Sequence, residues 1–307
     1  MVKPRVGLIG FGYWGKNIAR VLSEFGVLHA IADIHTGRLL AAGEVYPKEK
    51  SGVYCVQSTG EDGARVLKDA GCDHICIATP PETHYSIAMA SLNEGLHTFV
   101  EKPLSTDGQG AMVLESLALS KSLHLAVGHI YLHNPGLLYI PKPTGEAQLF
   151  VKLFNVAGPP SESTRDLFWA GMPHAASIAL HFFPVLSDMI ETRRADYSIS
   201  TYLSYFDGSS ATLEVADYIG VRKRSVELRV GNTRYVFDAD DPATYYTCSG
   251  TERRWASSEA RVEPLKEEVK AFLNKVKVTP TGSQVVKLVE MMIRDASKAK
   301  TNNGVRP

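Results

Sequence analysis

The most constraining feature of the sequence is a glycine-rich stretch, GFGYWG, at residues 10–15. The apolar run Val6 to Ile9 precedes it and is typical of a strand, and residues 13–25 are typical of a helix. In this context Gly10 permits a tight turn, Gly12 lets backbone amides approach a pyrophosphate, and Gly15 lets the helix pack on the strand. Free N–H groups at the start of the helix attract phosphates. The stretch therefore predicts a dinucleotide site.

Asp33 ends the next apolar run, residues 27–32, about 20 residues after the glycines, where a ribose-binding carboxylate is expected. A carboxylate there accepts hydrogen bonds from the ribose hydroxyls and repels a 2′-phosphate, so NAD is favoured over NADP. Arg38 is the nearest cation and could meet a 2′-phosphate, which leaves NADP as the second choice. Asp33 as a simple strand-end turn residue is the alternative interpretation.

Composition excludes several classes of protein. Lys plus Arg and Asp plus Glu are both 33, so the net charge is zero, which argues against nucleic acid or an anionic membrane as the partner. No apolar run approaches the ~20 residues that span a bilayer, and the start of the chain leaves no room for a signal peptide. Cys72 and Cys76 flank His74, but we expect them at a corner and inside a buried strand, so no metal site is predicted. A reduced, cytoplasmic protein is expected.

Strands and helices alternate through residue 128, which predicts a doubly wound Rossmann domain with a parallel sheet. The pattern predicts helices over 36–49, 61–70, 82–93 and 110–121, and strands over 53–55, 73–78, 96–100 and 123–127. Ligands of such a sheet bind at the carboxyl ends of its strands. Two candidates lie there. Thr79 to His84 follows one strand with two prolines, and Glu101-Lys102-Pro103 follows the next. The alternative for the two prolines is that they only form a turn, and the alternative for Lys102 is a lysine exposed to solvent in a turn.

These motifs in this order and spacing resemble the glucose-fructose oxidoreductase/inositol dehydrogenase (Gfo/Idh/MocA) family. They are GFGYWG, Asp33, ATPPETH at 78–84 and EKP at 101–103, and EKP is the most specific of them. The resemblance continues through VGH at 127–129, Asn134-Pro135, Gly145-Glu146 and residues 168–174. It is nearest to the branch that acts on nucleotide-linked sugars and sugar acids. The resemblance implies an NAD(P)-dependent oxidoreductase that transfers a hydride between nicotinamide and a hydroxyl or carbonyl carbon.

The second domain, residues 129–307, is expected to be α+β with a large open, mostly antiparallel sheet. Strand-like runs cover 146–156, 197–206, 211–217, 225–230 and 233–237, with hairpin turns at Asp207-Gly208 and Gly231-Asn232. Two helices, 264–278 and 282–298, close the chain and could pack back toward the first domain. Their apolar stripes are Leu265, Val269, Phe272 and Val276, then Val285, Val289, Met292 and Ala296. We expect residues 301–307 to be frayed. The family often dimerises through the outer sheet face, so the resemblance implies a homodimer or homotetramer.

For catalysis the family resemblance implies a lysine that hydrogen-bonds the reacting oxygen and a D-x-x-x-H pair that supplies an Asp and a general-base His. Lys102 and His174 match. A histidine titrates near neutral pH, and a cation stabilises an alkoxide-like oxygen. The Asp position is Ala170, however, and the residue after His174, often Asp in the family, is Ala175. Asp166, His181 or Asp188 could substitute, although a histidine in so apolar a helix is more often core.

The expected site residues follow. Cofactor contacts are Gly10, Phe11, Gly12, Tyr13, Trp14, Gly15, Asp33, Thr79, Pro80, His84, Glu101 and Lys102; substrate contacts are His129, Arg165, Asp166 and Trp169. The substrate is expected to be a sugar, sugar acid or nucleotide sugar. The alternative, which the two alanines favour, is a dinucleotide-binding sensor or partner subunit of the same fold without dehydrogenase chemistry.

Overall fold

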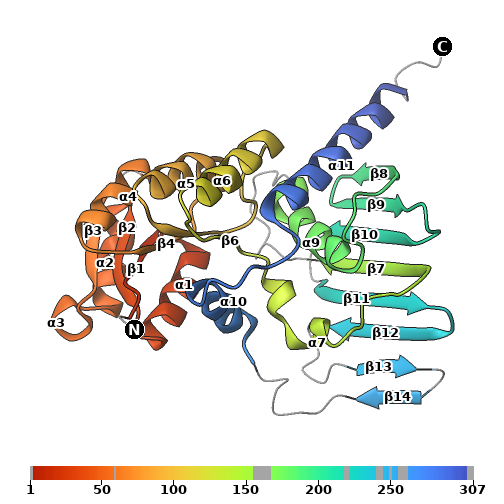
Figure 1. Cartoon of the computed structure of the whole chain (residues 1–307), viewed down its shortest axis with the longest axis horizontal. Helices are drawn as coiled ribbons and strands as arrows, with labels where there is room; N and C mark the ends of the chain where they lie inside the picture. Colours follow the sequence, from red (N-terminus) through yellow and green to blue (C-terminus); the bar gives the residue numbers. More distant parts are fainter. Residues whose placement is uncertain are drawn as a thin grey trace. The chain divides into compact units, whose positions relative to one another are not determined.

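The structure is a computed structural model that describes residues 3–58, 60–154, 167–217, 221–239, 245–248, 251–254 and 262–302. It divides into two compact units, shown with their elements in Figure 1. The first comprises residues 1–128 and 265–286, and the second comprises residues 129–264 and 287–307. The division after Gly128 falls where the sequence pattern changes. Residues 265–286 belong to the first unit although they follow the second sheet in sequence.

A six-stranded parallel sheet forms the centre of the first unit, with the order β3-β2-β1-β4-β5-β6. This is the strand order of a Rossmann domain, so the predicted fold class is confirmed. Its strands are β1 (Val6–Ile9), β2 (Leu28–Asp33), β3 (Tyr54–Gln57), β4 (His74–Ile77), β5 (His97–Val100) and β6 (Leu125–Val127). β1 and β4 are fully buried, as continuous apolar runs in a doubly covered sheet should be.

The helices between these strands are α1 (Tyr13–Glu24), α2 (Thr36–Val45), α3 (Lys48–Ser51), α4 (Gly60–Asp69), α5 (His84–Asn93) and α6 (Gly108–Ser120). The expected helix over 36–49 is wrong, because Pro47 interrupts it between α2 and α3. The helix expected from Glu82 begins instead as the 3₁₀ turn η1 (Pro81–Thr83). α6 begins two residues earlier than expected because the Asp107 carboxylate caps it, accepting hydrogen bonds from the amides of Gln109 and Gly110.

The two faces of the sheet are covered by different sets of helices. A Cβ on Gly7 would meet Leu67 of α4, so odd-numbered residues of β1 point toward α4. Val6 and Leu8 point the other way, and so do their parallel partners His74 and Cys76 on β4. That second face is the one that α10 (Pro264–Leu273) covers, because Phe272 of α10 packs its ring on His74. α10 lies beside α1, where Lys266 pairs with Glu24 at 2.6 Å (Figure 1).

The start of α11 (Gly282–Asn302) also belongs to the first unit. The Glu115 carboxylate of α6 accepts hydrogen bonds from the Ser283 amide at 2.9 Å and its hydroxyl at 2.6 Å. The two expected apolar stripes are buried except for Val276, which is 50% exposed. The reason is that α10 ends at Leu273, five residues before the expected end, and Lys275 adopts a φ of 56°. α11 continues through Thr301 and Asn302, and residues 303–307 lie outside the described ranges.

The second unit is built on an eight-stranded sheet with the order β14-β13-β12-β11-β7-β10-β9-β8. Among the described strands only β7 and β10 pair in parallel, so the expected mostly antiparallel sheet is confirmed. The strands are β7 (Ala147–Phe154), β8 (Met189–Ala195), β9 (Ser198–Ser204), β10 (Ser210–Ala216), β11 (Lys223–Val230), β12 (Thr233–Asp238), β13 (Tyr245–Cys248) and β14 (Thr251–Arg254). Both hairpins form at their expected turns, Gly208 with a φ of 84° and Gly231 with a φ of 55°.

Helices cover one face of this sheet. They include η2 (Ile130–His133), α7 (Pro135–Leu138), α8 (Leu167–Ala170) and α9 (Met172–Phe182), with the later part of α11. α9 approaches the sheet closely, since a Cβ on Gly171 would lie 2.2 Å from a methyl carbon of Val215 on β10. Asp295 of α11 accepts a hydrogen bond from the Thr192 amide of β8 at 2.6 Å. β8, which sequence patterning missed, thereby joins the sheet edge to α11. Among the described residues no helix is long and apolar enough to cross a membrane.

Three histidines gather on the α10 face of the first sheet, near the amino ends of its strands. The rings of His74 and His97 lie 4.7 Å apart, and His124 stacks on Phe272 at 5.8 Å. Nζ of Lys275 lies 2.8 Å from Nε2 of His97. Burial, then the neighbouring histidine and lysine charges, lowers the pKa of His97 to about 4, and burial with Lys275 lowers the pKa of His124. The rings of His97 and His124 are therefore neutral when the unit is folded at neutral pH.

We expect Gly15→Ala in α1 to destabilise the protein by about 1–3 kcal/mol, the range for overpacked sites. A Cβ on Gly15 would lie 1.9 Å from the Gly10 carbonyl oxygen, which belongs to backbone that cannot rotate away. The control is Gly43→Ala in α2, where a Cβ meets nothing within 4 Å and helix propensity should stabilise by ~0.5–1 kcal/mol. Urea unfolding of both variants measures this. Equal effects at the two glycines would contradict the close approach.

We expect the first unit to lose stability as the pH falls from about 6.5 toward 4. In that window the unfolded chain binds protons at His97 and His124 that the folded unit excludes, so the free energy of unfolding decreases on acidification. Above about pH 6.5 these two histidines leave the free energy of unfolding constant. His97→Asn retains an acceptor near the position that takes the His124 amide at 2.9 Å, and should flatten the pH dependence. Exposed His35→Asn should leave it unchanged. Urea titrations at several pH values test this, and a slope that survives in His97→Asn would refute it.

Candidate active site

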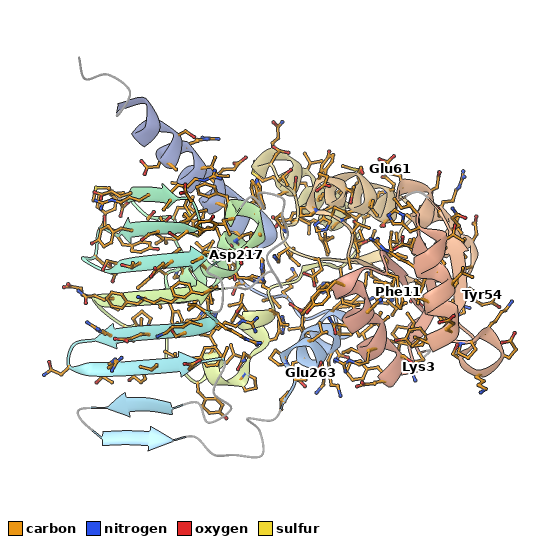
Figure 2. All side chains as sticks on the ribbon, turned by 180° about the vertical axis from the view of Figure 1, so that it is seen from behind. Lys3, Phe11, Tyr54, Glu61, Asp217 and Glu263 are labelled. Atoms are coloured by element: carbon orange, nitrogen blue, oxygen red, sulfur yellow. The ribbon has the colours of Figure 1, made fainter. Side chains whose placement is uncertain are left out.

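A backbone amide of the glycine-rich turn donates a hydrogen bond to the Asp33 carboxylate. The Phe11 amide donates to Oδ2 of Asp33 at 2.8 Å, and the His35 amide donates to Oδ1 at 2.8 Å. Phe11, labelled in Figure 2, therefore contributes its amide to the turn while its side chain is 2% exposed. The guanidinium of Arg38 lies 3.6 Å from Oδ2 and is 49% exposed. Each carboxylate oxygen keeps a second lone pair. Asp33 can therefore accept hydrogen bonds from ribose hydroxyls when the Arg38 side chain points away from it.

The start of α1 is shaped for an anion. Gly10 has a φ of 96°, and a Cβ there would lie 2.7 Å from the Ala78 carbonyl oxygen, so only glycine fits the turn. A Cβ on Gly12 would meet nothing within 4 Å, which leaves open space above the first amides of the helix. The N-cap residue is Gly12, which has no side chain that could cap the helix, and the first turn carries no acidic residue. The amides and the positive end of the helix dipole are thus available to a pyrophosphate.

The loop after β4 is tied to the loop after β5 by His84. Its Nδ1 lies 2.6 Å from the Pro103 carbonyl oxygen, its Nε2 lies 2.9 Å from the Thr79 carbonyl oxygen, and it is 1% exposed. Burial lowers the pKa of His84 despite these two carbonyls, so the neutral ring donates to one of them. The Thr83 hydroxyl donates to Thr79 Oγ1 at 2.7 Å. His84 positions the two loops, whereas Thr79 is partly exposed and Pro80 is exposed.

Glu101 and Lys102 directly follow β5, and Glu101 is linked to the glycine-rich turn. The Trp14 indole N–H donates to Oε1 of Glu101, and the Lys102 amide donates to Oε2 at 3.2 Å. A Cβ on Gly128 would lie 3.0 Å from the Glu101 carboxyl, so glycine after β6 leaves room for it. Both Glu101 and Lys102 are partly exposed. The structure thus brings the expected residues of the first unit to one edge of the sheet, at the carboxyl ends of β1, β2, β4 and β5.

His174 lies in the second unit, in the first turn of α9. It is 6% exposed and packs edge-on against Tyr131 of η2, with ring centroids 5.3 Å apart. Its carbonyl accepts the Ser177 hydroxyl at 2.8 Å, which fixes the turn. His129, expected to contact substrate, is 2% exposed, and Trp169 of α8 is partly exposed. Expected substrate residues Arg165 and Asp166 lie outside the described residues.

The two alanines in the place of family acids have different surroundings. Ala170 ends α8, and Gly171 separates it from α9, so the Ala170-to-His174 interval is not one uninterrupted helical turn. Ala175 is completely buried in α9, where an aspartate would lack water. His181 is near the end of α9, where burial, with a contribution from Lys142, lowers the pKa of its ring to about 4. Whether these residues bear on catalysis stays a prediction.

Comparison with known proteins identifies the first unit. Residues 4–129 match the model of an oxidoreductase family with an NAD-binding Rossmann fold, GFO_IDH_MocA. The N-terminal part of this chain is therefore similar to that family. The predicted resemblance is thereby confirmed, and NAD is the cofactor of the domain.

Curated relatives align with part of the chain. UDP-N-acetylglucosamine 3-dehydrogenase from Acidithiobacillus ferrooxidans is 29% identical over 140 residues, which are 46% of this chain and 41% of that enzyme. 4-Carboxy-2-hydroxymuconate-6-semialdehyde dehydrogenase from Sphingobium is 26% identical over 187 residues, 57% of each chain. The aligned segment thus spans about half the length of these relatives. A crystal form of the Acidithiobacillus enzyme shares the whole fold, with a TM-score of 0.82 and 20% identity over 97% of this chain and 99% of that one.

The geometry of the first unit fits NAD. The unfilled space at Gly12 can take the pyrophosphate, Asp33 can take the ribose, and the β4 and β5 loops border the same edge. No group of three or more His, Cys, Asp or Glu side chains in the described part of the chain could hold a metal. Sequence reasoning missed the link from Trp14 to Glu101, which no spacing rule announces. It also missed Glu268 of α10, whose one signal was a carboxylate inside the apolar stripe Leu265-Val269-Phe272.

We expect Asp33→Asn to raise the dissociation constant of NADH about ten- to a hundredfold, from the ~1.5–3 kcal/mol of hydrogen bonds to a charged group. An amide NH₂ would also oppose the amide of Phe11 or His35, each of which now donates to a carboxylate oxygen. The affinity for NADPH should fall less, because Arg38 remains to meet the 2′-phosphate. Fluorescence titration with both cofactors measures the change, with exposed Asp69→Asn as the control. Equal losses for NADH and NADPH would contradict the roles given to Asp33 and Arg38.

Proposed function

We propose that the protein is an NAD-dependent dehydrogenase that transfers a hydride between nicotinamide and a hydroxyl or carbonyl carbon of a sugar-type substrate. The observation that supports this most is the attachment of the Glu101-Lys102 turn to the glycine-rich turn through Trp14. The backbone of Lys102 is thereby held at the cofactor edge. A dinucleotide-binding protein without this chemistry would have no need of a cation fixed beside its nicotinamide end.

When bound, NAD supplies the hydride acceptor, and the chain supplies the rest. Lys102 would hydrogen-bond the reacting oxygen and stabilise the negative charge that develops as its proton leaves. His174 would accept that proton as the general base, since an imidazole titrates near neutral pH. Tyr131, which packs edge-on against His174, would hold the ring in orientation. Asp33 and the amides of α1 bind and orient the cofactor.

The finer substrate class is a sugar acid or nucleotide sugar. Its support is the relative that acts on UDP-N-acetylglucosamine, whereas the Sphingobium relative is named for a semialdehyde. The replacement of the family Asp by Ala170 removes a polar substrate contact. Arg165 and Trp169 are then the candidates for binding an acidic or aromatic part of the substrate. Assembly through the outer face of the eight-stranded sheet and a cytoplasmic location stay predictions.

A hydride-transfer screen over sugars, sugar acids and nucleotide sugars with NAD⁺ tests this function. On any substrate found, Lys102→Met and His174→Ala should each lower turnover by about a hundred- to ten-thousandfold, the range of general acid–base catalysis. NADH affinity of His174→Ala should be nearly unchanged. The control Lys121→Met alters an exposed lysine whose Nζ donates to the Asn93 carbonyl at 3.3 Å, and should have no effect.

The runner-up is a dinucleotide-binding sensor or partner subunit of the same fold, which Ala170 and the buried Ala175 favour. Tight NADH binding without turnover across the panel would support it and refute the enzyme. Absence of any dinucleotide binding would refute both.

A further inference from the structure

Glu268 is a buried carboxyl without a hydrogen-bond partner. It lies on α10, is 2% exposed, and neither of its oxygens has a partner among the residues that the structure describes. Its neighbour Glu267 by contrast is partly exposed and pairs with Lys270. A lone ionised carboxylate in such surroundings is very costly, whereas a protonated one is tolerated. The fold keeps this acid on the face of α10 that covers the sheet.

The packing of α10 places Glu268 on the same face of the sheet as Glu101. Phe272 contacts Phe99 of β5 with ring centroids 5.7 Å apart, which sets the level of the helix on the sheet. Glu268 is buried one helical turn before Phe272, about 6 Å along the axis. Glu101 is two residues after Phe99, about 6.6 Å along β5 and on the same face. Both carboxyls thus lie one step from the Phe99–Phe272 contact, Glu101 along the strand and Glu268 along the helix.

Electrostatics agree with that placement. Burial, and then the Glu101 charge, raises the pKa of Glu268 well above its ordinary value. Burial also raises the pKa of Glu101, but the Lys102 ammonium, the Trp14 indole and the Lys102 amide oppose the rise. Both carboxyls, after burial, raise the pKa of the Cys76 thiol on β4, which therefore lies near both and stays protonated. Glu101 thus has three groups that stabilise its charge, whereas Glu268 has none among the residues that the structure describes.

We propose that Glu101 and Glu268 form a carboxyl pair that holds one proton, on Glu268, beneath the cofactor edge, and that the pair releases this proton when NAD⁺ binds. The oxidised nicotinamide ring carries a positive charge that the reduced ring lacks. A positive charge at the edge where Glu101 and Lys102 lie favours ionisation of the pair. Glu268 is then a positioning residue: it sets the charge beside Lys102 without contacting substrate.

The charged and titratable groups around the pair come from each packed element. They are Glu24 on α1, Cys76 and His74 on β4, His97 on β5, Lys102 after β5, His124 before β6, and Lys266 on α10 itself, and the neutral Trp14 indole of α1 donates to Glu101. Glu24 and Lys266 neutralise each other at the surface, and His97 and His124 are neutral near pH 7. Lys102 and the bound cofactor remain to bias the pair. This release of a proton rests on the proposed placement of Lys102 at the reacting oxygen.

Infrared spectroscopy of the whole protein near pH 7 tests the pair without any cofactor. Wild type should show the C=O stretch of a protonated carboxyl, and Glu268→Gln should lack it while Glu267→Gln keeps it. Glutamine has the shape and neutrality of the protonated acid, so Glu268→Gln should fold. If it does not, the wild-type band and its response to NAD⁺ still decide. A wild type without the band at this pH would overturn the pair.

Proton release into weakly buffered solution with an indicator dye then tests the coupling. NAD⁺ should release up to one proton per site from wild type and from Glu267→Gln, and NADH should release none. Glu268→Gln should release none with either cofactor. Equal release from Glu268→Gln and wild type would overturn the coupling. Absence of NAD⁺ binding would instead refute the proposed function, while the carboxyl band would still report on the pair.

Discussion

The first unit depends on the close approach of Gly15 to the Gly10 carbonyl, which leaves no room for a side chain on residue 15. Because α1 begins that close to the end of β1, the Phe11 amide reaches Asp33 and the Trp14 indole reaches Glu101. Two strand ends separated by 68 residues are thereby held against one turn. A helix displaced by the width of a methyl group would lose both links. The cofactor edge is therefore set by backbone proximity, and the named side chains follow from it.

Elements whose signals are local were predictable. The glycine-rich turn, the alternation of strands and helices, and the hairpins at Gly208 and Gly231 each depend on a few adjacent residues. Element ends were less so: Pro47 divides a helix, and Lys275 adopts a left-handed conformation that leaves Val276 at the surface. β8 was missed because MIETRRA carries charges on an edge strand that has only one neighbour.

The site was predictable where a motif names the residue, and not where tertiary packing assigns the role. Asp33 and Glu101 lie where spacing puts them. His84 carries a motif position but is enclosed between two carbonyls, which no sequence pattern distinguishes from a histidine at the surface. Glu268 reads as one more polar residue of an amphipathic helix until Phe272 fixes which side of that helix is covered. Long-range packing decides such cases, and a single sequence does not contain it explicitly.

The return of α10 to the first unit has a consequence for how the chain is made. The strand face that carries Cys76, Phe99 and Glu101 is complete in sequence by residue 101, yet its cover is translated only after the whole second sheet. A growing chain must keep this face apart from other apolar surface until residue 265 and beyond emerge. The Rossmann domain thus cannot complete its folding before the second sheet has been translated. Its last layer is translated only after the second sheet, so the cofactor edge cannot mature before both sheets have been made.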